Sequence, residues 1–187
     1  MLSAENVPNR YDFREDIHNA ISNAPYVEMS ESGLSIAQAL EDAQKLERLA
    51  DRQDDSVITR VRDNMLGDVF IEEAHAYPVL VRQAMEMVYP PFIPKRLIDT
   101  WCRESVEHEM AHAAAASMLD KDVQYGVRIV KVKDTHNVAK LMMTCLIDVI
   151  GPNITKADLA FITAAPENIS EGDKHVLRSL GYTSLQT

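Results

Sequence analysis

The stretch KRLIDTWCRESVEHEMAHAAAASMLDKDVQYGVRIVKVK, residues 95–133, carries the strongest structural signals in this chain of 187 residues. Its first part, Lys95–Leu119, follows Pro94 and includes four consecutive alanines, which predicts one long helix. Apolar residues then alternate with polar or small ones over Val123–Lys133. This alternation predicts a strand, with a bulge where the pattern slips by one residue.

The predicted helix contains the motif H-E-x-x-H, as His108-Glu109-Met110-Ala111-His112. Residues four apart on a helix project from the same face, one turn apart. The two imidazoles can therefore bind one zinc ion, which lowers the pKa of bound water towards neutrality. Glu109 is placed to take a proton from this water and to pass it to a leaving amine. The motif predicts peptide-bond hydrolysis, with His108 and His112 as zinc ligands and Glu109 as the general base.

A catalytic zinc site needs a third protein ligand, which the motif does not supply. The segment Ser170-Glu171-Gly172-Asp173 lies at a predicted helix start, where a carboxylate is favoured electrostatically. Residue type alone leaves several downstream candidates open: His136, Asp148, Asp158, Glu167, Glu171, Asp173 and His175.

From residue 105 onward, the order of motifs resembles the peptidase domain of the FtsH-type AAA proteases, the M41 family. In that family an H-E-x-G-H-A helix precedes a strand, a helix with a small-residue turn, and a Gly/Ser-rich turn that carries an aspartate ligand. The corresponding pieces here are His108–Ala113, Val123–Lys133, the run that ends at Val149-Ile150-Gly151-Pro152, and residues 170–173. The resemblance implies that Asp173 is the third zinc ligand of a zincin-like, stand-alone peptidase domain.

The resemblance covers about the carboxy-terminal half and is specific at the pentapeptide. Ala111 stands where the family usually has glycine, and no Walker A motif is present. Unfolding of a protein substrate would therefore require a separate unfoldase or regulator. These features divide the chain into an N-terminal helical region, residues 1–93, and an M41-like zinc peptidase core, residues 94–187; the two can pack as one domain.

The other segments predict an α+β fold that is mainly α, with a small sheet or hairpin. Residues 89–94, which include Pro90, Pro91 and Pro94, must interrupt any helix. Helices are predicted from Ser32 or Ser35 to Gln53, from Asp55 or Ser56 to Leu66, over Asp68–Val88 with a kink or division near Pro78, and over Val138–Ile150, Lys156–Thr163 and Gly172–Leu180.

Composition limits the classes of partner. The formal net charge of −10 disfavours binding to nucleic acid or to an anionic membrane surface. The amino terminus lacks the pattern of a signal peptide, and no apolar run approaches the ~20 residues of a membrane span. Cys102 and Cys145 have no metal-ligand spacing and are expected to be buried thiols in a reducing compartment. We expect a cytoplasmic protein that acts on a peptide or protein substrate; oligomeric state is open.

Two alternatives use the same residues differently. The chain can bind zinc without turnover, as a regulatory or interaction protein. Alternatively, Glu72-x-x-His75 and Glu109-x-x-His112 can form a di-iron site in a ferritin-like bundle, with Glu47 and Glu104 as further ligands.

Two further expectations concern the surroundings of the motif. Glu104 and Glu107 either orient an imidazole or are exposed helix charges. Val123–Lys133 is the strand expected to align a peptide substrate by backbone pairing, or it is simply part of a small sheet.

Overall fold

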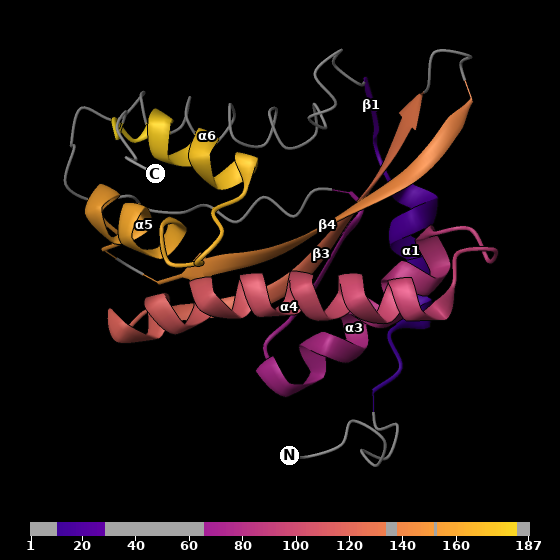
Figure 1. Ribbon diagram of the computed structural model, residues 1–187, viewed down its shortest axis with the longest axis horizontal. Helices are drawn as coiled ribbons and strands as arrows, with labels where there is room; N and C mark the ends of the chain where they lie inside the picture. Colours follow the sequence, from indigo (N-terminus) through magenta and orange to yellow (C-terminus); the bar gives the residue numbers. More distant parts are fainter. Residues whose placement is uncertain (1–10, 29–65, 134–137, 152, 183–187) are drawn as a thin grey trace.

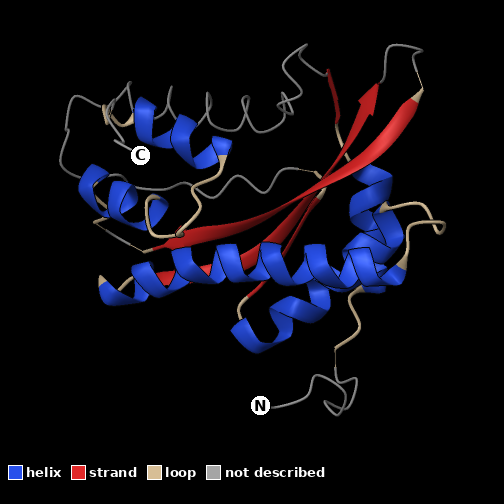
Figure 2. Cartoon of the chain, in the orientation of Figure 1, coloured by secondary structure: helices blue, strands red, loops and turns tan. Residues whose placement is uncertain are grey.

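The computed structural model describes residues 11–28, 66–133, 138–151 and 153–182, and shows an α+β fold in which helices pack against a twisted sheet (Figures 1 and 2). The elements are α1 (Arg14–Asn23), β1 (Tyr26–Glu28), β2 (Asp68–Ile71), the 3-10 helix η1 (Ala74–Ala76), α3 (Tyr77–Val88), α4 (Lys95–Met118), β3 (Asp122–Lys133), β4 (Ala139–Ile150), α5 (Lys156–Thr163) and α6 (Glu171–Ser179). More of the described residues lie in helices than in strands.

Strand β3 is the centre of the four-stranded sheet. Along one side it pairs antiparallel with β4 over its full length, from Asp122↔Ile150 to Lys133↔Ala139. On the other side it pairs antiparallel with β2 and then parallel with β1. Among the described strands, β4 pairs with β3 alone.

One face of the sheet packs against the helices. Alternate residues of β3, namely Tyr125, Val127 and Ile129, are buried in the main hydrophobic cluster with residues of α1, α3 and α4. Helix α4 crosses this face and α3 lies beside it, whereas α5 and α6 lie on the other side of α4 (Figure 1). The described part of residues 1–93 thus shares its core with the elements that follow residue 94.

Three expectations about secondary structure are wrong. Residues 68–71 form β2 instead of the first turn of a helix, because they pair with β3; the helix begins at Tyr77, with Pro78 in its first turn. Residues 139–150 form β4 instead of a helix. The pairing of β3 with β4 advances one residue at a time without interruption, so the predicted bulge is absent.

The reason for the error at β4 is the presence of apolar residues on both faces of the strand. Leu141, Met143 and Cys145 pack towards the helical core, but Met142 on the opposite face is also apolar and packs against Val130 and Val132. The polar residues Lys140, Thr144 and Asp148 also recur every four positions, as on one face of a helix, so the pattern fits a helix as well as a strand.

The predictions for the remaining elements are confirmed. Helix α4 ends one residue before the predicted Leu119, and β3 begins one residue before Val123. Helix α5 has the predicted bounds, and α6 is displaced by one residue. The helices predicted before Leu66 lie outside the described residues. Within the described part of the chain, no helix is both long and apolar enough to cross a membrane.

Candidate metal centre

Three side chains from two distant segments meet beside the middle of α4. His108 and His112 lie one turn apart on α4, and Asp173 comes from the first turn of α6. Nε2 of His108 is 3.0 Å from Oδ2 of Asp173. Nε2 of His112 is 3.3 Å from Oδ1 of the same carboxylate and 3.3 Å from Nε2 of His108. Among the described residues, this is the only group of three or more His, Cys, Asp or Glu side chains with metal-binding geometry.

The separation of the two imidazole nitrogens is compatible with a zinc ion. Zinc binds imidazole nitrogen and carboxylate oxygen at ~2.0–2.2 Å, usually with tetrahedral geometry, so two ligand atoms of one site lie about 3.3–3.5 Å apart. The two Nε2 atoms are 3.3 Å apart, and each faces a different oxygen of Asp173, Oδ2 at 3.0 Å from His108 and Oδ1 at 3.3 Å from His112. Two imidazoles and one carboxylate also match the ligand set of catalytic zinc sites with one open position.

Helix α5 orients the His112 ring. Nδ1–H of His112 donates a hydrogen bond of 2.8 Å to the carbonyl oxygen of Ile162, near the end of α5. A carbonyl oxygen only accepts, so the proton is on Nδ1, and Nε2 of a neutral ring presents its lone pair to the cluster. His112 is 7% exposed, which restricts the ring further. Ile162 thus provides the contact outside the ligand set that fixes the tautomer suited to metal binding.

The amino terminus of α6 holds the carboxylate of Asp173. The backbone N–H and the hydroxyl of Ser170 donate to Oδ2 of Asp173 at 2.9 and 2.6 Å, and the N–H of Asp173 donates back to the Ser170 oxygen at 3.1 Å. These bonds form a capping box. Because Oδ2 accepts the Ser170 bonds, Oδ1 faces His112. A local helix-capping motif therefore orients the third candidate ligand.

Electrostatics couple the three groups. Burial raises the pKa of Asp173, but hydrogen bonds from His108 and His112 outweigh it and hold that pKa well below its usual range. Burial lowers the pKa of His112, but the bonds with Asp173 and Ile162, together with the negative charge of Asp173, give a net rise. Each partner thus stabilises the charged form of the other.

Glu109 lies beside the histidines but towards the sheet. It follows His108 by one residue, so it projects about 100° around α4 from that ring. Its charge raises the pKa of three groups: His112, the thiol of Cys145 on β4, and the hydroxyl of Tyr77 on α3. Glu109 is partly buried, and its charge acts on groups of α3, α4 and β4.

The strand expected to align a substrate is misassigned in the sequence interpretation. Val123–Lys133 belongs to β3, which is paired on both sides and has no open edge along most of its length. Among the described strands, β4, the segment predicted to be a helix, pairs with β3 alone. Leu141, Met143, Cys145 and Ile147 of β4 pack against the same core as Val106 and Met110 of α4. Strand β4 therefore runs beside the helix that carries the motif.

None of the other described candidates for the third ligand joins the cluster of His108 and His112. Asp158 forms the capping box of α5 with Thr155 and lies 3.8 Å from Nζ of Lys121. Glu171 pairs with Lys174 on the surface of α6. Asp148 is buried opposite Gln124 in the sheet. Glu167 and His175 are exposed and His136 lies outside the described residues.

The residues of the di-iron alternative are not brought together. Glu72 accepts a bond of 3.5 Å from Gln124, and His75 lies in η1, where its Nε2 forms a hydrogen bond of 2.5 Å with the Tyr11 hydroxyl. Glu104 is exposed, and Glu47 lies outside the described residues. The described elements also form a four-stranded sheet with helices packed against it, whereas the di-iron site requires a four-helix bundle. The α+β fold therefore contradicts this alternative.

Sequence reasoning missed two contacts at the site. The Ile162 carbonyl is a backbone group, so no residue type predicts it. The role of Ser170 could have been predicted, because Ser-x-x-Asp before an apolar segment is a capping-box pattern. Conversely, Glu104 and Glu107 are exposed, which agrees with the simpler interpretation of solvated helix charges.

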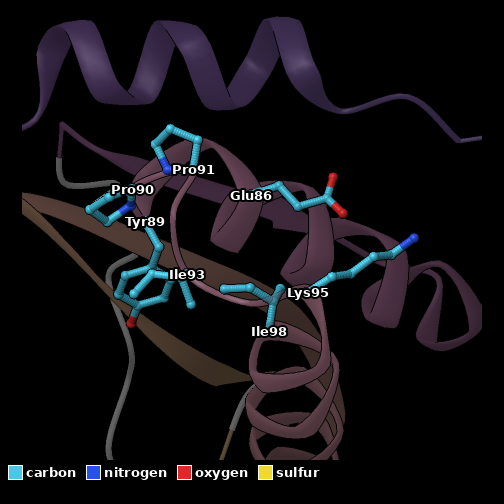
Figure 3. A pocket seen from close by; sticks show the side chains of 7 residues that line it. All are labelled: Glu86, Tyr89, Pro90, Pro91, Ile93, Lys95 and Ile98. Carbon is cyan, nitrogen blue, oxygen red and sulfur yellow. The ribbon is translucent and has the colours of Figure 1, made fainter.

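A small hollow of about 220 Å³ lies apart from the cluster, at the connection between α3 and α4 (Figure 3). It is lined by Glu86, Tyr89, Pro90, Pro91, Ile93, Lys95 and Ile98. Ile98 precedes His108 by ten residues, about 15 Å along the helix axis. The hollow is therefore outside the candidate metal centre. Tyr89 also contacts the ring of Trp101 on α4.

Comparison of the chain with family models, with curated proteins and with solved structures gives no match. Function is therefore inferred from the residues of the chain and their arrangement.

Proposed function

We propose that the chain is a zinc-dependent metallopeptidase, with His108, His112 and Asp173 as the zinc ligands and Glu109 as the general base. The observation that carries this proposal is the convergence of two imidazoles and one carboxylate, from residues up to 65 positions apart, with one ligand atom of each within 4.8 Å of the others. An H-E-x-x-H helix without a third ligand would support zinc binding only weakly, because it lacks part of the usual ligand set.

Bound zinc would supply Lewis-acid chemistry, since it lowers the pKa of water and polarises a carbonyl group. The chain's own groups do the rest. His112 is held in one tautomer by Ile162, and Asp173 is held by Ser170, so the ligands need little rearrangement. Glu109 would accept the proton of the attacking water and donate it to the amine that leaves.

The substrate would be an extended polypeptide that lies beside β4. Extended peptides are commonly held by backbone pairing with a strand, whatever the side chains of the peptide. Strand β4 is 12 residues long and passes Glu109 near Cys145. A peptide paired there would bring a backbone carbonyl towards the ligand cluster.

The similarity to the M41 peptidases extends this proposal. Helix α4, β3 and the Asp173 segment follow the family order, whereas β4 replaces the helix expected before Gly151. We propose a peptidase core that receives unfolded segments, with a separate unfoldase or regulator for folded substrates. A cytoplasmic location is also proposed, because Cys102 and Cys145 are both unpaired thiols.

The test is a pair of matched substitutions on α4. Glu109→Gln should leave one zinc atom per chain, measured by elemental analysis, and should abolish cleavage of an unfolded protein such as casein. Glu107→Gln changes an exposed glutamate of the same helix and should alter neither quantity. Zinc binding without cleavage in the unmodified protein would instead identify an inert zinc-binding protein. Unchanged cleavage in Glu109→Gln would remove Glu109 from the mechanism.

A further inference from the structure

Trp101, which contacts Tyr89, lies on the same face of α4 as the candidate metal centre. Trp101 precedes His108 by seven residues, which is within about 20° of two full helical turns. It therefore points in nearly the same direction as the imidazoles, about 10 Å away along the helix axis. Its ring contacts that of Tyr89 edge to face, with 5.6 Å between centroids.

Trp101 is the accessible member of the pair. It is 36% exposed, and Leu97, one turn earlier on α4, is also exposed, whereas Tyr89 is partly buried. Burial raises the pKa of Tyr89, and the nearby thiol of Cys145 raises it further; Glu109 in turn raises the pKa of Cys145. Tyr89, Cys145 and Glu109 are thus close enough to influence one another.

We propose that Trp101 and Tyr89 form a specificity subsite for an apolar side chain of the peptide substrate, about three residues from the bond that is cleaved. The spacing follows from geometry, because an extended chain rises ~3.3 Å per residue and the rings lie about 10 Å from the imidazoles along α4. An aromatic pair offers a large, rigid apolar contact area to such a side chain. This inference rests on the proposed peptidase function and adds to it a preference for an apolar side chain at one position of the substrate.

The first experiment measures binding without turnover. Trp101 is the only tryptophan of the chain, so its fluorescence emission reports directly on the proposed subsite. Zinc-loaded Glu109→Gln protein is titrated with a peptide rich in Ala and Ser that contains one Phe, and with the same peptide carrying Ser instead. The Phe peptide should shift the emission and bind at least about tenfold more tightly, the usual scale for filling an apolar pocket. An emission that neither peptide changes would overturn the subsite.

The second experiment maps cleavage. The unmodified protein should cut the Phe peptide about three residues from Phe, as identified by mass spectrometry. Trp101→Ala should lose this positional preference and about tenfold in kcat/KM, with zinc content unchanged. Phe92→Ala is the matched control, because Phe92 is an aromatic residue that is 80% exposed and lies outside the proposed subsite. Phe92→Ala should behave like the unmodified protein.

The two proposals fail in different ways. If the unmodified protein cuts peptides and Trp101→Ala keeps the same positional preference, the subsite is wrong and the peptidase function stands. If zinc-loaded protein cuts no peptide, the peptidase function is wrong. The fluorescence titration then decides separately whether Trp101 binds an apolar side chain, and it does not depend on the folding of a Trp101 variant.

Discussion

Nε2 of His108 lies 3.0 Å from Oδ2 of Asp173, although 65 residues separate them in the sequence. The contact joins α4 to α6, a helix whose only buried residue is Leu177. Helix α6 therefore owes much of its placement to the polar cluster, and a metal ion bound by all three ligands would fasten it to α4. Metal binding and the position of α6 should thus be coupled.

Asp173→Ala should weaken zinc binding by more than the roughly 10–100-fold that the loss of an outer contact costs, because it removes a ligand. Asp158→Ala is a closely matched control: Asp158 forms the same capping box on α5 but faces Lys121. Zinc affinities of the two variants can be measured by competition with a chelating dye. Equal affinities would show that Asp173 is not a ligand.

Ser170→Ala should lower zinc affinity by about 10–100-fold while leaving all three ligands in place, because Ser170 directs the carboxylate of Asp173. It should also destabilise the protein by about 1 kcal/mol through loss of the helix cap. Thr155→Ala removes the corresponding hydroxyl cap of α5 and should cost a similar amount of stability with little change in zinc affinity. If both variants bind zinc like the unmodified protein, the cap of α6 is purely structural.

The signals that predicted the site are local, and the features that escaped prediction depend on tertiary contacts. Pro94 and the residues after it define α4 to within one residue, and the H-E-x-x-H spacing then places both histidines on one face. The pairing with Asp173 came from the order of motifs in a similar family, since several other carboxylates had suitable residue types.

The missed strands show where local information ends. Strand β2 has four residues, too few for a periodic signal, and it is a strand because β3 lies beside it. Strand β4 carries apolar side chains on both faces, as Met142 and Met143 illustrate, so burial on two sides hides its period. The sequence therefore predicts β3 as a strand but not its partner β4.

Protein stripped of metal by a chelator should become more stable as the pH falls from about 8 to about 6. The pKa of His112 is raised in the folded chain above its unfolded value of ~6.5, so the folded state binds this proton more tightly. The stabilisation is complete below the unfolded pKa and is lost as the pH rises through the folded pKa. Asp173 has a lowered pKa, so its contribution persists until the pH falls below about 4.

Urea unfolding at several pH values, followed by circular dichroism, measures this dependence. His112→Gln should reduce it, because the titrating group is gone. Zinc-loaded protein should show the opposite trend, since protons compete with the metal for the same nitrogen and oxygen atoms. A stripped, unmodified protein whose stability stays constant or increases from pH 6 to pH 8 would contradict the coupling between His112 and Asp173.

Cys145 should resist thiol reagents at pH 8 despite its position beside the proposed general base. Burial and then the charge of Glu109 raise the pKa of this thiol to about 12, so only about one molecule in ten thousand carries the reactive thiolate. Burial raises the pKa of Cys102 as well. Reaction with a chromogenic disulfide should therefore be slow in the folded protein and should reach two thiols per chain in denaturant. Glu109→Gln should accelerate the modification of Cys145, because it removes a negative charge that opposes the thiolate, and it should leave Cys102 unaffected.

Rapid labelling of Cys145 in the folded, unmodified protein would contradict this prediction. It would mean that β4 is not packed against α4 and that Glu109 does not lie near Cys145.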